Sequence, residues 1–307
     1  MADLSVAIGG GLTLKNPILT ASVTFGYGLE YDDFYDVSTL GGICTKGLSL
    51  HPRLGNSPER ICETPAGMLN AIGLANVGVE AFCTQKLPTL RKRGVCVVAN
   101  IFASSVEDFV KITERLEQEA GVAAVELNVS CPNVKEGGIE FGKNADQCAA
   151  VTAAVRRATK RPIWVKMSPE ASDINAVGKA CEDAGADALT AINTIRGMAI
   201  DVQTQKLRLH NATGGLSGPS LRPIALRVVW QLTQVVKIPV IGIGGVMSVR
   251  DALEFLLAGA SAVQVGTANF SDPCAAKKIL DGLDAYCDEQ GLKAADLIGR
   301  ARIVGAG

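Results

Sequence analysis

The sequence is poor in histidine, and its cysteines are scattered. It contains two histidines, His51 and His210, and nine cysteines that form no CxxC pair. Zinc and iron–sulfur sites usually draw on clustered ligands, so neither kind of metal site is expected in this chain. No disulfide framework is expected either, because the chain is long and carries no secretion signal. With so little histidine, proton transfer would fall to a thiolate, a carboxylate or a lysine.

Long apolar runs and an excess of one charge are also missing. The chain has 30 basic and 31 acidic residues and a net charge of -1. This balance offers no basic stripe for nucleic acid and no polybasic tail for a membrane surface. Gly or charged residues break every apolar run before it reaches membrane-spanning length. The start, MADLSVAIGGGLTLKNP, does not read as a signal peptide, so a cytoplasmic location is expected.

Eight short apolar runs recur along the 307 residues, 48% of which are hydrophobic. The runs are nearly continuous rather than alternating, which is typical of strands covered on both faces in a parallel sheet. They occupy residues 16–22, 41–49, 95–102, 123–130, 162–168, 188–195, 238–245 and 262–268.

Amphipathic helices are predicted between most of these strands. Ser104 and Glu107 fit a capping box at the start of one helix. This repetition of strand and helix favours a single (β/α)8 TIM barrel over residues 1–307, with a doubly wound open sheet as the alternative. Segments near residues 49–76 and 196–220 are expected as insertions at the carboxyl-terminal face of the barrel. Further apolar stripes cover residues 148–158, 174–184, 221–236 and 249–257.

Polar side chains recur where the predicted strands end. In a barrel these ends meet at one face, which carries the active site. A single buried asparagine is ordinarily a satisfied core group, but several at equivalent strand ends favour a functional site. The polar residues at these ends are Ser22, Thr45, Lys46, Asn100, Asn128, Cys131, Lys166, Asn193 and Thr194.

The last two predicted strands end in glycine, as IGIGG at 241–245 and VGT at 265–267. Glycine lets backbone N–H groups approach an anion, and the start of a following helix adds a favourable dipole. A ligand that carries phosphate is therefore expected. No GxGxxG motif follows a first strand, which argues against a dinucleotide site of the Rossmann type. A mononucleotide with one phosphate fits a barrel better, and FMN is the natural candidate. A Schiff-base lysine at Lys166 or Lys46, as in aldolase-type barrels, remains an alternative on these observations alone.

Longer motifs resemble one known family, the dihydroorotate dehydrogenases, over nearly the whole chain. The similarity is greatest to the FMN-containing catalytic subunits of the NAD-linked class 1 branch. That family folds as a (β/α)8 barrel, which agrees with the pattern of strands and helices. The motifs are TKGLSLHPRLGN, GMLNAIGLAN, VVANIF, NVSCPNVKEGGIEFG, VKMSP, AINTIRGMAID, TGGLSGPSLRPIAL, IGIGG and VGTANF.

The resemblance implies a role for Cys131, in the NVSCPN motif. It would be the base that takes the proton from C5 of dihydroorotate, while hydride passes from C6 to N5 of FMN. The product would be orotate, in the de novo synthesis of pyrimidines (UMP). A thiol has an ordinary pKa of about 8.5, which local charge can tune toward neutrality.

The resemblance also implies which residues hold the two ligands, and it implies no metal site. Those expected to bind FMN are Ala21, Ser22, Thr45, Lys46, Asn100, Asn128, Lys166, Ile192, Gly218, Gly244, Gly245, Gly266 and Thr267. Those expected to bind dihydroorotate or orotate are Lys46, Asn70, Ile72, Gly73, Leu74, Asn128, Asn193 and Thr194. Asparagine suits the amide-like edges of this ring because it offers a donor and an acceptor together.

A partner subunit with FAD and a 2Fe–2S cluster is implied as the route to NAD, in a heterotetramer built on a homodimer. A fumarate-linked class 1 enzyme is the nearest alternative. A flavin-dependent reductase of uracil-type pyrimidines is another, and it should not need the carboxylate of the substrate. The non-catalytic alternative is a flavin-binding or structural barrel in which Cys131 is inert, since fold alone does not fix function.

Overall fold

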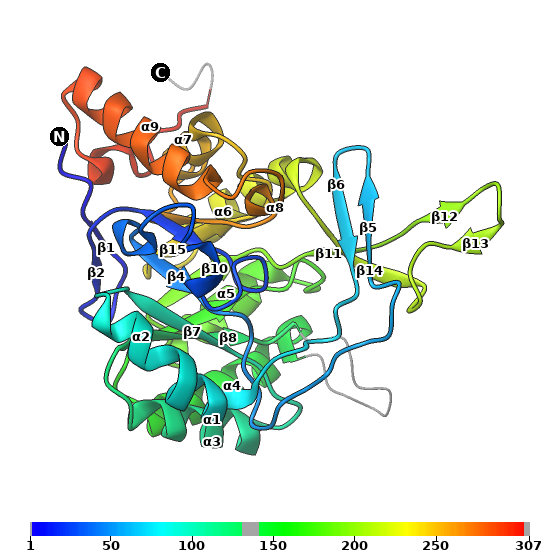
Figure 1. Ribbon diagram of the computed structural model, residues 1–307. Coiled ribbons are helices and arrows are strands. Elements are labelled where there is room, and N and C mark those ends of the chain that lie inside the picture. Colours follow the sequence, from blue (N-terminus) through cyan, green and yellow to red (C-terminus); the bar gives the residue numbers. More distant parts are fainter. Residues whose placement is uncertain (1, 131–140, 304–307) are drawn as a thin grey trace.

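The computed structural model of the chain describes residues 2–130 and 141–303, and its centre is a closed barrel of parallel strands (Figure 1). The strands follow one another around the barrel in the order β10-β15-β16-β3-β4-β7-β8-β9. This closure confirms the predicted TIM barrel and excludes the open sheet. The strands are β3 (Ile18–Thr20), β4 (Gly42–Cys44), β7 (Val97–Ile101), β8 (Val122–Asn128), β9 (Ile163–Lys166), β10 (Ala188–Ala191), β15 (Val240–Ile243) and β16 (Ala262–Val265).

Helices connect most neighbouring strands, as the apolar stripes predict. Between β3 and β4 the chain forms only short 3-10 turns, at Leu29–Tyr31 and Val37–Thr39. None of the helices in the described residues is long and apolar enough to cross a lipid bilayer. The helices are α1 (Gly78–Ala81), α2 (Leu87–Lys92), α3 (Val106–Glu117), α4 (Ala145–Ala158), α5 (Ile174–Asp183), α6 (Arg222–Thr233), α7 (Val249–Leu257), α8 (Ala268–Ser271) and α9 (Ala275–Gln290).

Local capping explains where two of these helices begin. At α7 the Ser248 hydroxyl accepts from the Asp251 N–H at 3.3 Å, and the Asp251 carboxylate accepts from the Ser248 N–H at 2.9 Å. Such a cap stabilises a helix by about 1 kcal/mol. At α3 the cap is Ser105, which is extended and accepts from the Asp108 N–H at 3.1 Å. The prediction of Ser104 was therefore wrong by one residue.

A second sheet is built from the two segments expected as insertions. It contains β5 (Ile61–Thr64), β6 (Gly67–Asn70), β11 (Ile195–Met198) and β14 (Thr213–Ser217), in the antiparallel order β11-β14-β6-β5. In Figure 1 this sheet stands to the right of the barrel, and a hairpin of β12 (Ile200–Asp201) and β13 (Lys206–Leu207) extends beyond it. The sequence analysis placed these segments but did not predict their strands.

The amino-terminal end of the barrel is closed by a hairpin of β1 (Val6–Ala7) and β2 (Thr13–Leu14), at the left in Figure 1. Its buried side chains, such as Ile8 and Leu14, form one apolar cluster with Trp164 and other inward-facing barrel residues. Side chains alternate between the two faces of a strand, so every second residue of a barrel strand points into the barrel. The inward-pointing side chains therefore form layers, which follow one another from the apolar cluster to the carboxyl-terminal ends of the strands.

Candidate functional site

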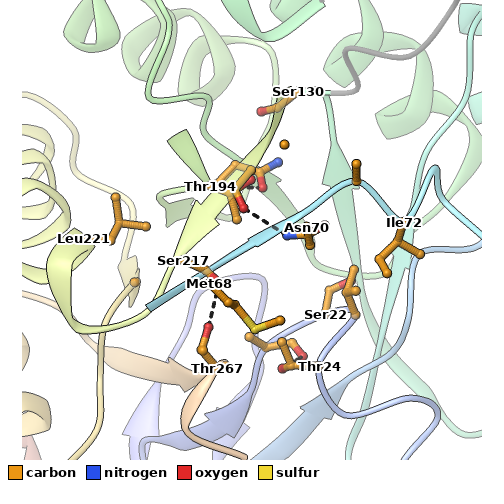
Figure 2. A pocket seen from close by; sticks show the side chains of 18 of the residues that line it. Ser22, Thr24, Met68, Asn70, Ile72, Ser130, Thr194, Ser217, Leu221 and Thr267 are labelled. Carbon is orange, nitrogen blue, oxygen red and sulfur yellow. Dashed lines mark hydrogen bonds between the residues drawn. The ribbon is translucent and has the colours of Figure 1, made fainter. Parts of the chain in front are cut away.

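A cavity of about 970 Å³ lies over the carboxyl-terminal ends of the barrel strands. Barrel strand ends form its floor, and β6 and β14 of the four-stranded sheet supply one wall (Figure 2). Its volume is at the upper end of the range for small-molecule and cofactor sites. Thus the cavity occupies the position at which a TIM barrel carries its active site.

The cavity brings together most of the residues expected at the site. Thr45 and Asn100 do not line it, because both side chains are fully buried behind its wall. Cys131 lies outside the described residues, and Ser130 just before it lines the cavity. The expected residues that line the cavity are Ala21, Ser22, Lys46, Asn70, Ile72, Gly73, Leu74, Asn128, Lys166, Ile192, Asn193, Thr194, Gly218, Gly244, Gly245, Gly266 and Thr267.

Amide side chains gather at one end of the cavity and hold one another in place. Asn193 Nδ2 donates to Asn128 Oδ1 at 3.1 Å, and the Thr194 N–H donates to Asn193 Oδ1 at 2.8 Å. Asn70 Nδ2 donates to the Gly215 carbonyl of β14 at 3.3 Å. These bonds fix the amide planes before a ligand arrives, so a planar ring with amide-like edges would meet preset donors and acceptors.

Two lysines supply the positive charge of the cavity. Burial lowers the pKa of Lys46 below its ordinary 10.5, and the charge of Arg60 lowers it further, while the Glu30 carboxylate opposes both effects. Lys166 is buried at the end of β9 and also lines the cavity. Neither ammonium has an ion-pair partner among residues 2–130 and 141–303. Both charges are therefore available to an anionic ligand.

Glycine lines the other end of the cavity, where the backbone itself is exposed to a ligand. Gly244 and Gly245 have φ of 127° and 76°, a region that favours glycine. A Cβ on Gly245 would lie 2.7 Å from the Arg222 nitrogen at the start of α6. Helix α6 begins there without a side-chain cap, but the Arg222 N–H donates to the Pro219 carbonyl and Pro223 has no N–H, so the glycine backbone and the helix dipole are what this end offers to a ligand. This end suits an anion such as phosphate.

Several lining residues escaped the sequence analysis, and most of them lie on the four-stranded sheet. Met68 and Ser217 face the cavity in Figure 2, and Ser217 Oγ accepts from the Thr267 hydroxyl at 2.8 Å. Glu170 and Arg196 also line it, with Nε and Oε1 at 3.7 Å. No periodic signal marks Met68, Arg196 and Ser217, because the strands that carry them are short and partly exposed, and Glu170 lies in the loop between β9 and α5.

Polar atoms without a partner are a further feature of the site. The described residues contain no group of three or more His, Cys, Asp or Glu side chains arranged to hold a metal ion. Two serine hydroxyls, of Ser22 and Ser130, are buried there without a hydrogen-bond partner in the described part of the chain. Buried polar atoms normally have partners, so these hydroxyls are available to a ligand.

Sequence comparison identifies the family to which this arrangement belongs. A sequence model of the family described as "Dihydroorotate dehydrogenase" matches residues 4–286. A protein of Geobacter sulfurreducens is 54% identical over 290 residues, which cover 94% of this chain and 95% of that protein. One of Geotalea daltonii is 52% identical over 302 residues, covering 98% and 99%. Both are named "Dihydroorotate dehydrogenase B (NAD(+)), catalytic subunit".

The match extends over almost the entire barrel and both segments of the four-stranded sheet, and it agrees with the resemblance drawn from the motifs. The chain therefore belongs to the dihydroorotate dehydrogenase family.

Proposed function

We propose that this chain is the catalytic subunit of an NAD-linked dihydroorotate dehydrogenase, which oxidises dihydroorotate to orotate in pyrimidine biosynthesis. The observation that carries the proposal is a single cavity that joins an amide-lined end to a glycine-lined end. A pyrimidine ring fits the first end, and a cofactor with a phosphate fits the second. The family membership and the names of the relatives support the same activity.

FMN is the proposed cofactor, and the donors of the cavity fit it. Its phosphate would lie against Gly218, Gly244, Gly245, Gly266 and Thr267, close to the uncapped start of α6. Its ring would lie over Ala21, Ser22 and Ile192, with Lys166 near its polar edge. The unpartnered Ser22 hydroxyl supports this fit because it offers a hydrogen bond at the ring. The bound flavin would supply the hydride acceptor.

Dihydroorotate is proposed to bind beside it, among the amides. Asn70, Asn128, Asn193 and Thr194 would bind the ring edges, and Lys46 would pair with the carboxylate. Asn193 donates to Asn128 and Asn70 donates to the Gly215 carbonyl, so the amides are held in place and would orient C6 of the ring before the reaction begins. The backbone of residues 72–74 would complete the enclosure and exclude water.

Cys131 is proposed as the base that takes the proton from C5. Its neighbour Ser130 lines the cavity, which supports a position for the following loop at the substrate end. A thiolate is effective near neutral pH only if its pKa is lowered toward that value, and lysine charges favour the thiolate. Lys46 and Lys166 are the cations that line the cavity at this face, together with Arg196.

The electrons are proposed to leave through a partner subunit that carries FAD and a 2Fe–2S cluster, with NAD as final acceptor. The words "catalytic subunit" in the names of the relatives support a partner for this chain. A heterotetramer built on a homodimer, in the cytoplasm, is the proposed assembly. The purified chain should then reduce an artificial dye with dihydroorotate, but reduce NAD only when the partner is added.

An anaerobic absorbance spectrum tests the proposal most directly. The purified chain, reconstituted with FMN, should show an oxidised flavin band that bleaches when dihydroorotate is added. Cys131→Ser should slow this bleaching about 10²–10⁴-fold near pH 7, because a serine hydroxyl is a far weaker base. Cys274→Ser at the start of α9 is the control and should bleach at the normal rate.

Each failure in this experiment has its own meaning. A chain that takes up no FMN would overturn the proposed cofactor. A flavin band that is unchanged by dihydroorotate but responds to uracil-type pyrimidines would overturn the proposed substrate. Normal bleaching by Cys131→Ser would overturn the role of Cys131 as base and leave the overall reaction standing.

A further inference from the structure

A carboxylate lies inside the barrel, beneath the cavity. Glu126 is on β8, two residues before Asn128, and its side chain is fully buried. Four donors from four other strands converge on it. Cys44 Sγ lies at 3.2 Å, Asn100 Nδ2 at 2.6 Å, Thr190 Oγ1 at 2.9 Å and Gln264 Nε2 at 2.8 Å.

These four bonds satisfy the carboxylate completely. Oε1 accepts from Cys44 and Asn100, and Oε2 accepts from Thr190 and Gln264. Two acceptances at each oxygen are the full complement of an ionised carboxylate. A layer of apolar side chains would serve the fold as well or better, because burying a charge is costly. The retained charge therefore points to a use beyond stability.

One effect of Glu126 is on the Asn100 amide. Because Nδ2 is held by Glu126, the amide cannot turn, and Oδ1 is directed away from the carboxylate. Oδ1 has no hydrogen-bond partner among the described residues. It lies beside Gly47, which lines the cavity, since a Cβ built on Gly47 would be 2.9 Å from it. The carbonyl is thus fixed directly behind the wall of the cavity, next to Gly47.

The second effect is electrostatic. Lys166 on β9 is paired in register with Thr190, whose hydroxyl donates to Glu126. Glu126 is paired in register with Trp164 on β9, and Lys166 is two residues further along that strand, so the two charged side chains belong to adjacent inward layers of the barrel. At such depth charges interact over many ångströms, because little water screens them. Glu126 therefore offsets the positive charge that Lys166 brings to the floor of the cavity.

We propose that Glu126 is a positioning residue for the flavin: it fixes the Asn100 amide directly behind the cavity wall, and its charge offsets the positive charge of Lys166 beneath the ring. This inference rests on the proposed binding of FMN. A negative charge under the flavin makes the addition of electrons less favourable. Glu126 thus lowers the reduction potential of the bound flavin and eases the passage of electrons onward to the acceptor.

The test is an anaerobic equilibrium titration of the FMN-loaded full chain against a dye of known potential. E126Q removes the charge and should shift the balance between oxidised and reduced flavin toward the reduced form by roughly tenfold. K166M should shift it in the opposite direction. The double variant E126Q/K166M should return close to the wild-type balance, because it removes both charges. If E126Q alone fails to fold, the double variant compared with K166M isolates the same charge.

Thr190→Val is the matched control. It deletes one donor to Glu126 in the same layer, at the same bulk, and leaves the carboxylate in place. It should lower the unfolding temperature without moving the flavin balance. Equal flavin balances in wild type, E126Q and the double variant would overturn the role of Glu126, even if stability fell. A wild-type chain that binds no FMN would overturn the proposed function as well, so the two failures are distinguishable.

Discussion

Lys46 is the residue whose protonation should control binding of an anionic substrate. A carboxylate binds the ammonium form, so affinity for orotate should be constant at low pH and fall as pH rises through the pKa of Lys46. Burial and Arg60 lower this pKa below 10.5, so the fall should begin at a lower pH than for an exposed lysine. Isothermal titration of orotate into the FMN-loaded chain across pH measures this.

Two variants identify the group responsible. Lys46→Met should weaken orotate binding by about tenfold or more and remove the alkaline fall, because the charged partner is lost. Lys206→Met, on the exposed β12–β13 hairpin, should leave the profile unchanged. An alkaline fall that survives in Lys46→Met would assign the titration to another group.

Buried cysteines should be distinguishable from Cys131 by their reactivity. Burial raises the pKa of the Cys44 thiol well above its usual value, and the Glu126 carboxylate adds to this effect. At Cys148 the neighbouring Cys181 thiol, with the two Sγ atoms 3.1 Å apart, raises the pKa, and burial raises it further. Thiolate is the reactive form, so these cysteines should resist alkylation in the folded protein.

Iodoacetamide at pH 8 followed by peptide mass spectrometry checks this. Cys131 should be modified quickly, and orotate should protect it. Modification of Cys44 in the folded chain at a comparable rate would contradict the picture of a closed interior.

At the scale of elements, β14 is the strand that should matter most for substrate affinity. A Cβ on Gly215 would lie 2.1 Å from Thr194 Oγ1, and the Gly215 carbonyl accepts from Asn70. Gly215→Ala should therefore displace two proposed substrate contacts and raise KM for dihydroorotate about tenfold, which corresponds to the loss of one good hydrogen bond. Steady-state kinetics with a dye acceptor gives the value.

Gly197→Ala on the adjacent strand β11 is the control. Its Cβ would meet the end of the flexible Leu69 side chain at 2.9 Å, which can yield. A KM that rose equally in both variants would mean that the sheet as a whole, not its contact with Thr194, sets the affinity.

The elements also show what the sequence could reveal and what it could not. Apolar runs located all eight barrel strands, because strands buried on both faces keep an apolar composition whatever lies around them. The apolar stripe at residues 249–257 coincides with α7, whose cap, Ser248, the sequence analysis did not name. The strands of the outer sheet were missed. β14 reads TGGLS and is only partly buried, so it has neither an apolar run nor an alternation to detect.

For the whole molecule, the sequence predicted the site as a set of strand ends, and most of these residues line the cavity. The resemblance also named Asn100 and Thr45 as ligand residues; both side chains are fully buried and do not line the cavity, so their contact with a ligand stays a prediction. It did not name Glu126, although the two-residue period of a strand puts Glu126 on the same inward face as Asn128. Residues that act through a neighbour make no contact of their own with a ligand, so motif comparison passes over them.

The two ends of the barrel are expected to serve different purposes: the closed amino-terminal end contributes to stability, and the open carboxyl-terminal end carries the activity. Leu14 is 1% exposed in the cluster beneath Trp164, on the side of the barrel opposite the cavity. Leu14→Ala should lower the free energy of unfolding by about 2–5 kcal/mol, because it leaves a void in a packed core. Val202→Ala, at a side chain 87% exposed, should change it by less than about 0.5 kcal/mol.

Urea unfolding measures both variants, and kcat and FMN affinity measured well below the unfolding transition should match wild type in each. Stability and activity separate because the Glu126 carboxylate, which lies between Leu14 and the cavity, is held by four hydrogen bonds from four strands and need not move when the β1–β2 hairpin packs less tightly. Loss of FMN affinity in Leu14→Ala without loss of stability would mean that the β1–β2 hairpin is coupled to the cavity through that network. Stability and activity would then not be divided between the two ends of the barrel.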